Sequence, residues 1–232
     1  IVRMTRKKVD RESNRREITQ AEEDRISILF KHIGKPDHKD AFEVLIDTGL
    51  RHGELWRLDA ESVNFEAKQL HIWKTKNGSP RTVPMSERVK VILKRRVEQY
   101  PSGPLWPQGN KDWKRNGWQV VRGLMGLSED IGFVTYSTRH TACSRLVRGG
   151  MALADVARWM GHKDISVTMR YAHLAPGQLF EGLEAMQRAK DMERLRALRM
   201  TGLLPAEVKL TDATGPAQLH SDVSVWKEAL AQ

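Results

Sequence analysis

The stretch TYSTRHTACSRLVRGGMALADVARWMGHKDISVTMRYAHL, residues 135–174, determines how we interpret the rest of the chain. Glycines at 149, 150 and 161 divide it into three short helical pieces. We expect these pieces over residues 137–148, 152–160 and 165–174. They carry more reactive side chains than a plain hydrophobic core needs: Arg139, His140, His162 and Tyr171. The stretch therefore predicts a functional site built on short helices.

Two helices are predicted near the start of the chain, over residues 19–31 and 39–48. The first has a capping-box signature where it begins, and Gly49 can end the second in a left-handed conformation. The helical pattern restarts at once after Gly49. Arg51 is therefore expected at a tight junction between helices, where rigid supports can aim its side chain.

The residue pattern changes to that of β-strands between residues 62 and 85. Short β-type runs occupy residues 63–65, 70–73 and 81–84. The turn between the last two carries Lys76, a position that is often just a solvated loop lysine. Helical patterns resume over residues 86–99 and 110–127. The sequence thus predicts an α+β fold, mainly α-helical, with a small three-stranded antiparallel β-sheet near residues 62–85.

Three parts of the chain differ in composition. In residues 1–18, basic side chains outnumber acidic ones by seven to three and aliphatic side chains are few, which predicts a basic interdomain linker in a piece of a longer protein. Residues 19–178 form the folded domain. Residues 179–232 form a C-terminal helical tail, with helices expected over 177–200 and 224–230.

Composition narrows the class of protein. A formal charge of +10 on 232 residues favours a polyanionic partner, because basic side chains set against phosphates release condensed counterions. A single cysteine, Cys143, excludes an internal disulfide and a cysteine-cluster zinc site. No apolar run approaches the ~20 residues of a membrane span, and no signal peptide opens the sequence. We expect a cytoplasmic, nucleoid-associated protein with no membrane partner.

Five short segments follow one another in a fixed order. They are TGLRHGEL at 48–55, Lys76 placed eight residues before Pro84, Arg139-His140-Thr141, the run 153–162 ending in Met160-Gly161-His162, and MRYAH at 169–173. Together they resemble the catalytic boxes of the tyrosine recombinases, the phage integrase family. The resemblance runs from about residue 19 to residue 178, and five boxes in order are far more specific than any one.

The resemblance implies a role for each matched residue. Tyr171 is the implied nucleophile, which attacks a DNA phosphodiester and forms a 3′-phosphotyrosyl bond. Arg51 and Arg139 are the implied clamp on the non-bridging oxygens. His162 matches the second histidine position, and Lys76 matches the lysine that protonates the leaving 5′ oxygen. The implied protein is the catalytic domain of a site-specific recombinase or integrase, acting on double-stranded attachment sites as a homotetramer, with accessory DNA-bending proteins as further partners.

The residue types suit this chemistry. Charge gathers on the equatorial oxygens of a pentacoordinate phosphorus, and two planar guanidinium groups meet it with several fixed donors. A tyrosyl ester conserves the energy of the broken bond, so no ATP is needed. The sequence holds no Walker-type phosphate loop, and neither the paired carboxylates nor the histidine-rich cluster of a two-metal nuclease. We therefore expect no cofactor and no metal.

Tyr136 departs from the family pattern, which has a histidine three residues before the second arginine. A tyrosine can hydrogen-bond a phosphate oxygen, but it is not a cation near neutral pH. We expect Tyr136 to be a supporting donor, with slower or differently pH-dependent cleavage.

Two further residues are expected to support the site. Glu54 stands three residues after Arg51 on the same helical face, where it can orient that guanidinium or remain an exposed carboxylate. His140 follows Arg139 directly and points about 100° away from it on a helix, so we expect a structural, hydrogen-bonding histidine. His52 and His173 are expected to be neighbours of the site.

The sequence is compatible with two alternative functions. A type IB topoisomerase-like enzyme uses the same transesterification but only relaxes DNA. The run 154–171 also matches a helix-turn-helix, with glycine in the turn, which favours a non-catalytic DNA-binding regulator. The regulator leaves Arg51, Lys76 and Arg139 unexplained.

The departure at Tyr136 gives the first testable prediction. Replacing Tyr136 by His restores a group that titrates near neutral pH, so the pH profile of DNA cleavage should change, and the cleavage rate at neutral pH should rise severalfold, within the ~10²-fold that acid–base catalysis supplies. The measurement is the rate of covalent complex formation between pH 5 and 9. A Tyr136→Phe variant with full activity would remove Tyr136 from the site.

Overall fold

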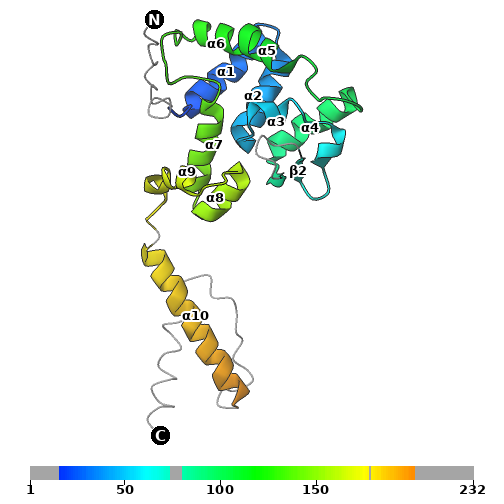
Figure 1. Cartoon of the computed structure of the whole chain (residues 1–232). Helices are drawn as coiled ribbons and strands as arrows, with labels where there is room; N and C mark the ends of the chain where they lie inside the picture. The colour runs from blue at the N-terminus through cyan, green and yellow to red at the C-terminus, as the bar shows by residue number, and fades with distance from the viewer. Residues whose placement is uncertain (1–15, 74–79, 178, 202–232) are drawn as a thin grey trace, which may run out of the picture. The chain divides into compact units, whose positions relative to one another are not determined.

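A computed structural model describes residues 16–73, 80–177 and 179–201 of the chain. The chain divides into two units, Ile1–Pro176 and Gly177–Gln232. The first unit is α+β as predicted, with helices around a small sheet (Figure 1). The predicted hairpin tip with Lys76 and the predicted helix over 224–230 lie outside the described residues.

Helices α1 (Gln20–His32) and α2 (Pro36–Thr48) form the first part of the core. The predicted capping box is confirmed, because the Thr19 hydroxyl accepts from the backbone of Glu22 at 3.3 Å. The second helix begins three residues earlier than predicted, since Pro36 is preorganised for a first helical turn. Gly49 ends α2 in the left-handed conformation, as predicted, with a φ of 65°.

A three-stranded antiparallel sheet follows a short α3 (His52–Leu55). Its strands, in spatial order, are β1 (Val63–Asn64), β2 (Gln69–Ile72) and β3 (Arg81–Pro84). The register pairs Leu70 with Val83, and both side chains are fully buried. The predicted sheet is confirmed, and its alternation buries one face against the helices.

Helix α4 (Glu87–Gln99) begins at the predicted cap. The helical structure predicted over 110–127 is confirmed over residues 109–124, where α5 (Gly109–Asp112), a π-helical stretch (Trp113–Trp118) and α6 (Gln119–Leu124) follow one another directly. A π-helix brings residues five apart onto one face, whereas an α-helix would turn them away from each other. The rings of Trp113 and Trp118 accordingly stack with their centroids 5.8 Å apart, and each residue is only 1% exposed.

The stretch 135–174 forms α7 (Ser137–Arg148), α8 (Leu153–Met160), α9 (Ser166–Met169) and a 3₁₀ turn (Ala172–Leu174). The single helix predicted over 165–174 is wrong, because α9 already ends at Met169 and a separate 3₁₀ turn begins after Tyr171. A 3₁₀ turn aligns residues three apart, and Tyr171 and Leu174 both pack on the small core between α7 and α8. The nucleophile candidate thus lies between two short helical turns.

The second unit contains α10 (Leu179–Met200), which the sequence predicted over 177–200. Its side chains from Gly182 onward are mostly exposed, with Glu184 and Arg188 paired one turn apart. No helix among the described residues is long and apolar enough to cross a membrane.

Candidate active site

Three arginines from different elements meet the C-terminal end of α8. Each binds one of three consecutive carbonyls: Arg81 Nε donates to Trp159 at 2.8 Å, Arg139 Nη2 to Met160, and Arg51 Nη2 to Gly161 at 2.9 Å. The last carbonyls of a helix have no partner within the helix and form the negative end of its dipole. The guanidinium groups therefore satisfy this end of α8.

Arg139 joins the ends of α2 and α8 while being almost fully buried. Its Nη1 donates to the carbonyl of Gly49 at 2.5 Å, and its residue exposure is 2%. Burial lowers the pKa of the Arg139 guanidinium to about 10, although Tyr136 acts to raise it. The group remains a cation at neutral pH. Its buried Nε–H has no hydrogen-bond partner among the described residues, and an anion's oxygen would supply one.

Glu54 is the carboxylate that holds two of these arginines together. Its oxygens accept from Arg81 at 2.8 and 2.7 Å, from the Arg51 side chain at 3.1 Å and from the Arg51 backbone at 2.8 Å. Burial alone would raise the pKa of the Glu54 carboxyl, but Arg81 and then Arg51 hold it at about 2. Glu54 therefore stays ionised and fixes both guanidinium groups.

Arg81 was missed by the sequence analysis. The signal was the strand alternation, because Arg81 shares a face of β3 with the buried Val83, and its side chain is only 7% exposed. A Cβ added to Gly161 would lie 3.0 Å from Arg81, so the glycine also leaves room for this side chain. Three cations around one carboxylate give this cluster a net positive charge, which favours an anionic ligand.

A pocket beside this cluster holds five of the predicted site residues. Its lining includes Tyr136, Arg139, His140, His162 and Tyr171. Arg51 and Glu54 are not among the residues that line it, and Arg51 donates to the carbonyl of Gly161, which directly precedes the lining residue His162. The structure therefore brings five predicted residues together in one pocket and places Arg51 and Glu54 in the neighbouring cluster.

His140 contacts Tyr171 directly. A hydrogen bond of 2.7 Å joins His140 Nδ1 to the phenol oxygen of Tyr171, and the two ring centroids lie 5.1 Å apart. The sequence predicted a structural histidine at position 140. Its partner is instead the candidate nucleophile. His52 by contrast packs on Trp113, and its pKa is lowered to about 4 by burial.

His162 is held in place by the chain that follows it. A hydrogen bond of 2.8 Å joins its Nδ1 to the hydroxyl of the buried Thr168. Burial, and then the charges of Arg139 and Arg51, lower the pKa of His162 to about 4. The imidazole is therefore neutral at pH 7 when no anion occupies the site.

Lys76, predicted as the acid of the site, lies outside the described residues. In the part of the chain that the structure describes, no cluster of three or more histidine, cysteine or acidic side chains is arranged to hold a metal ion.

Comparison with known proteins shows which protein family the sequence matches. The model of the phage integrase family matches residues 16–178. The shufflon-specific DNA recombinase of Escherichia coli is 29% identical over 174 residues, which cover 75% of this chain and 44% of that protein. Across four curated relatives, the chain spans 41% to 62% of the relative's length.

Solved structures share the fold at lower sequence identity. The catalytic domain of bacteriophage HP1 integrase has a TM-score of 0.59 at 23% identity, covering 73% of this chain and 94% of that one. The Tn1549 transposon integrase in complex with circular intermediate DNA has a TM-score of 0.57 at 23% identity, covering 78% and 67%.

The buried Glu54 carboxylate predicts a pH-dependent stability. Its pKa is depressed in the folded state, so its stabilising effect is present above the ordinary value of 4.5 and is lost as the pH falls towards about 2. Glu54→Gln should lower the free energy of unfolding by about 3 kcal/mol at pH 7, and by much less at pH 3. Urea unfolding at both pH values measures this difference.

Glu87→Gln is the matched control, because Glu87 is fully exposed and pairs with Lys68 on the surface. Its effect on stability should be much smaller at pH 7. An equal loss for Glu54→Gln at pH 7 and pH 3 would contradict the ionised role of Glu54.

Proposed function

This chain belongs to the phage integrase family, and we propose that it is the catalytic part of a site-specific DNA recombinase. It cuts and rejoins DNA strands through a covalent bond between Tyr171 and the 3′ phosphate of the cut strand. The observation that carries this proposal is the pocket that Tyr171 and Arg139 both line, next to the cluster in which Arg51 and Arg139 bind the last carbonyls of α8.

The arginines recognise the scissile phosphate. A phosphate oxygen that accepts from Arg139 Nε completes the hydrogen bonding of that guanidinium, while Arg51 adds a second positive charge beside Gly161. Both groups are already fixed by helix carbonyls and Glu54, so little reorganisation is needed when charge develops on the equatorial oxygens.

The pKa of His162 is expected to change when a phosphate binds in the pocket. Burial and then the neighbouring arginines depress the pKa of His162 in the free protein, and a bound anion offsets the arginine charges and raises that pKa again. Thr168 holds Nδ1, which leaves Nε2 for a phosphate oxygen. His162 is therefore a neutral ligand that becomes a stronger donor as negative charge accumulates. Tyr136 adds a phenolic donor in the same pocket.

Lys76 is proposed, from the resemblance of its segment alone, to protonate the leaving 5′ oxygen. The broader assignment follows the family: a cytoplasmic, nucleoid-associated protein that recombines double-stranded attachment sites as a homotetramer, with accessory DNA-bending proteins. The solved Tn1549 integrase in complex with circular intermediate DNA supports DNA as the partner.

The two alternative functions are a DNA-binding regulator and a topoisomerase-like enzyme. A regulator needs a recognition helix after α8, and α9 has four residues, which gives a poor fit to a DNA major groove. A type IB topoisomerase-like enzyme would use the same residues but would relax DNA without exchanging strands.

Covalent trapping tests the proposed function. With a nicked DNA that loses the strand beyond the cut, the wild-type protein should form a protein–DNA adduct, because religation is no longer possible. Tyr171→Phe should form none. Tyr100→Phe is the matched control, since Tyr100 packs against Arg96 outside the pocket and its loss should leave the adduct unchanged.

Two results would redirect the assignment. DNA that is bound without any adduct would favour the regulator. An adduct accompanied by relaxation alone, with no strand exchange between two sites, would favour the topoisomerase.

The C-terminal unit is proposed either to dock α10 on a neighbouring protomer, which would link subunits, or to pack α10 on its own domain. Deleting residues 177–232 should then reduce tetramer formation and recombination by about tenfold or more, while changing DNA affinity less. Analytical ultracentrifugation on DNA and a two-site recombination assay measure this. Unchanged recombination would contradict the proposal.

A further inference from the structure

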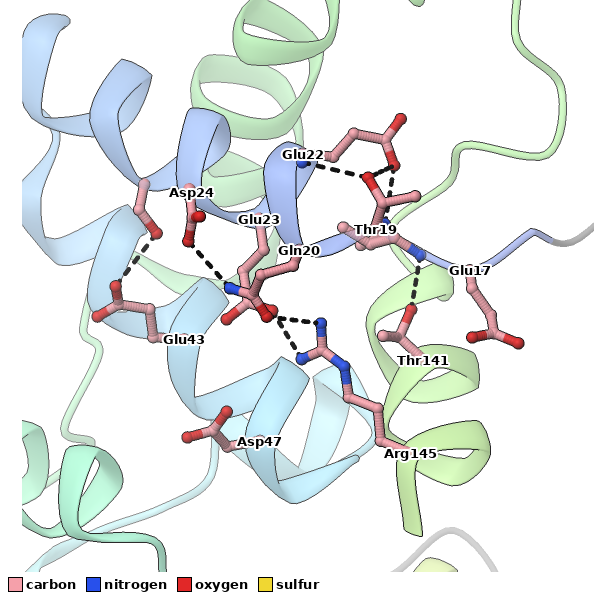
Figure 2. A network of polar contacts seen from close by, with 12 residues as sticks. Glu17, Thr19, Gln20, Glu22, Glu23, Asp24, Glu43, Asp47, Thr141 and Arg145 are labelled. Atoms are coloured by element: carbon pink, nitrogen blue, oxygen red, sulfur yellow. Dashed lines mark hydrogen bonds and ion pairs between the residues drawn. The ribbon is translucent and has the colours of Figure 1, made fainter. Parts of the chain in front are cut away.

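Residues 16–18, the end of the segment predicted as a linker, lie against α7. The backbone N–H of Ile18 donates to the Thr141 hydroxyl at 2.8 Å, a contact visible in Figure 2, and Ile18 is 2% exposed. Arg16 donates to Asp130 at 2.6 Å and pairs with Glu22 at 2.7 Å. These contacts on both sides hold Glu17, which lies between them, against the helix.

Glu17 meets one face of α7. His140, Ser144 and Arg148 are spaced four residues apart, so they lie along a single helical face. Arg148 donates to both oxygens of Glu17, at 2.6 and 2.8 Å. Glu17, His140, Ser144 and Tyr171 line the same pocket. The carboxylate is therefore held next to the histidine that contacts the nucleophile.

The electrostatics of Glu17 agree with this placement. Partial burial alone would raise the pKa of the Glu17 carboxyl, but Arg148 and then Ser144 and His140 lower it below its ordinary value. The group is an anion at neutral pH. A carboxylate beside an imidazole stabilises the imidazolium, as in nucleophile–base–acid arrangements in general.

We propose that His140 is the base that accepts the proton of Tyr171, and that Glu17 is the positioning residue that stabilises the protonated His140. This inference rests on the proposed recombinase function and adds to it an assignment of the base. His140 Nδ1 takes the phenol proton while the Tyr171 oxygen bonds to phosphorus. The bond from phosphorus to the 5′ oxygen breaks, and an acid on the leaving side supplies that oxygen with a proton. In religation His140 returns its proton to Tyr171.

The step has a clear chemical need. A tyrosine with a pKa near 10 is almost wholly protonated at neutral pH and is a weak nucleophile. A base in hydrogen-bond contact with it supplies about 10²- to 10⁴-fold in rate, and the 2.7 Å contact of His140 meets that geometric condition. Because Glu17 is one of residues 16–18, activation of the nucleophile also depends on these three residues lying against α7.

The first test compares single-turnover cleavage by four variants. The probe is a nicked duplex carrying a DNA site that the wild-type protein has trapped covalently. Glu17→Gln should cleave about tenfold to a hundredfold more slowly, and His140→Asn, which retains an acceptor but no basic group, at least a hundredfold more slowly. Glu17→Asp should restore most of the rate. Asp24→Asn, which makes the same charge change at an exposed position of α1, should match the wild type.

The second test separates the nucleophile from the leaving group. A 5′-bridging phosphorothiolate in the same DNA gives a leaving thiolate that needs no proton. The defects of Glu17→Gln and His140→Asn should persist on this substrate, because the base still has to act on Tyr171. If the substitutions impaired only proton donation to the leaving group, the cleavage defects would disappear on this substrate.

Two outcomes would overturn the inference. One is cleavage by Glu17→Gln within twofold of the wild-type rate, and the other is loss of the Glu17→Gln defect on the phosphorothiolate substrate. Thermal unfolding and non-covalent DNA affinity show whether each variant is folded. If Glu17→Gln is not folded, the same two criteria are applied to the cleavage rates of His140→Asn. A wild-type protein that traps no DNA would defeat the recombinase proposal itself, whereas a cleaving wild type with an unaffected Glu17→Gln would defeat the inference alone.

Discussion

The C-terminal end of α8 is the constraint on which the rest of the site depends. Three consecutive carbonyls, at residues 159 to 161, each accept from a different arginine. These arginines come from the α2–α3 junction, β3 and α7, so one helix end gathers parts of the chain that are far apart in sequence. Hydrogen bonds to charged donors contribute about 1.5–3 kcal/mol each, and leaving such buried groups unpaired costs as much. The contacts that position the three guanidinium groups are therefore also the contacts that stabilise the end of α8.

This arrangement links the fold to the proposed chemistry. The groups that hold α8 are the groups that would bind a phosphate, and Gly161, which allows the close approach of Arg81, directly precedes His162. Burial, and then the neighbouring positive charges, lower the pKa values of Arg139 and His162 in the free protein. A bound phosphate relieves that repulsion. The site is thus preorganised for an anion before any substrate arrives.

Much of the fold followed from local sequence rules, and much of what was missed depends on tertiary contacts. Glycines predicted the ends of α2 and α8, and period-two patterning predicted the sheet. The end of α9 at Met169 was missed, because a short run of helix-forming residues does not reveal which of them pack on α7 and α8. Arg81 and Glu17 were missed because their partners lie 27 and 131 residues away in sequence. The partner of His140 was equally invisible, since only the fold brings Tyr171 to it.

Every proposed step depends on Tyr171 becoming covalently attached to a cut DNA strand. The most direct measurement is mass spectrometry of the protein trapped on nicked DNA, after digestion of both protein and DNA. The account predicts a peptide containing Tyr171 that carries a nucleotide through its 3′ phosphate, with a free 5′ hydroxyl on the released strand. A nucleotide attached to another residue, or linked through a 5′ phosphate, would contradict it.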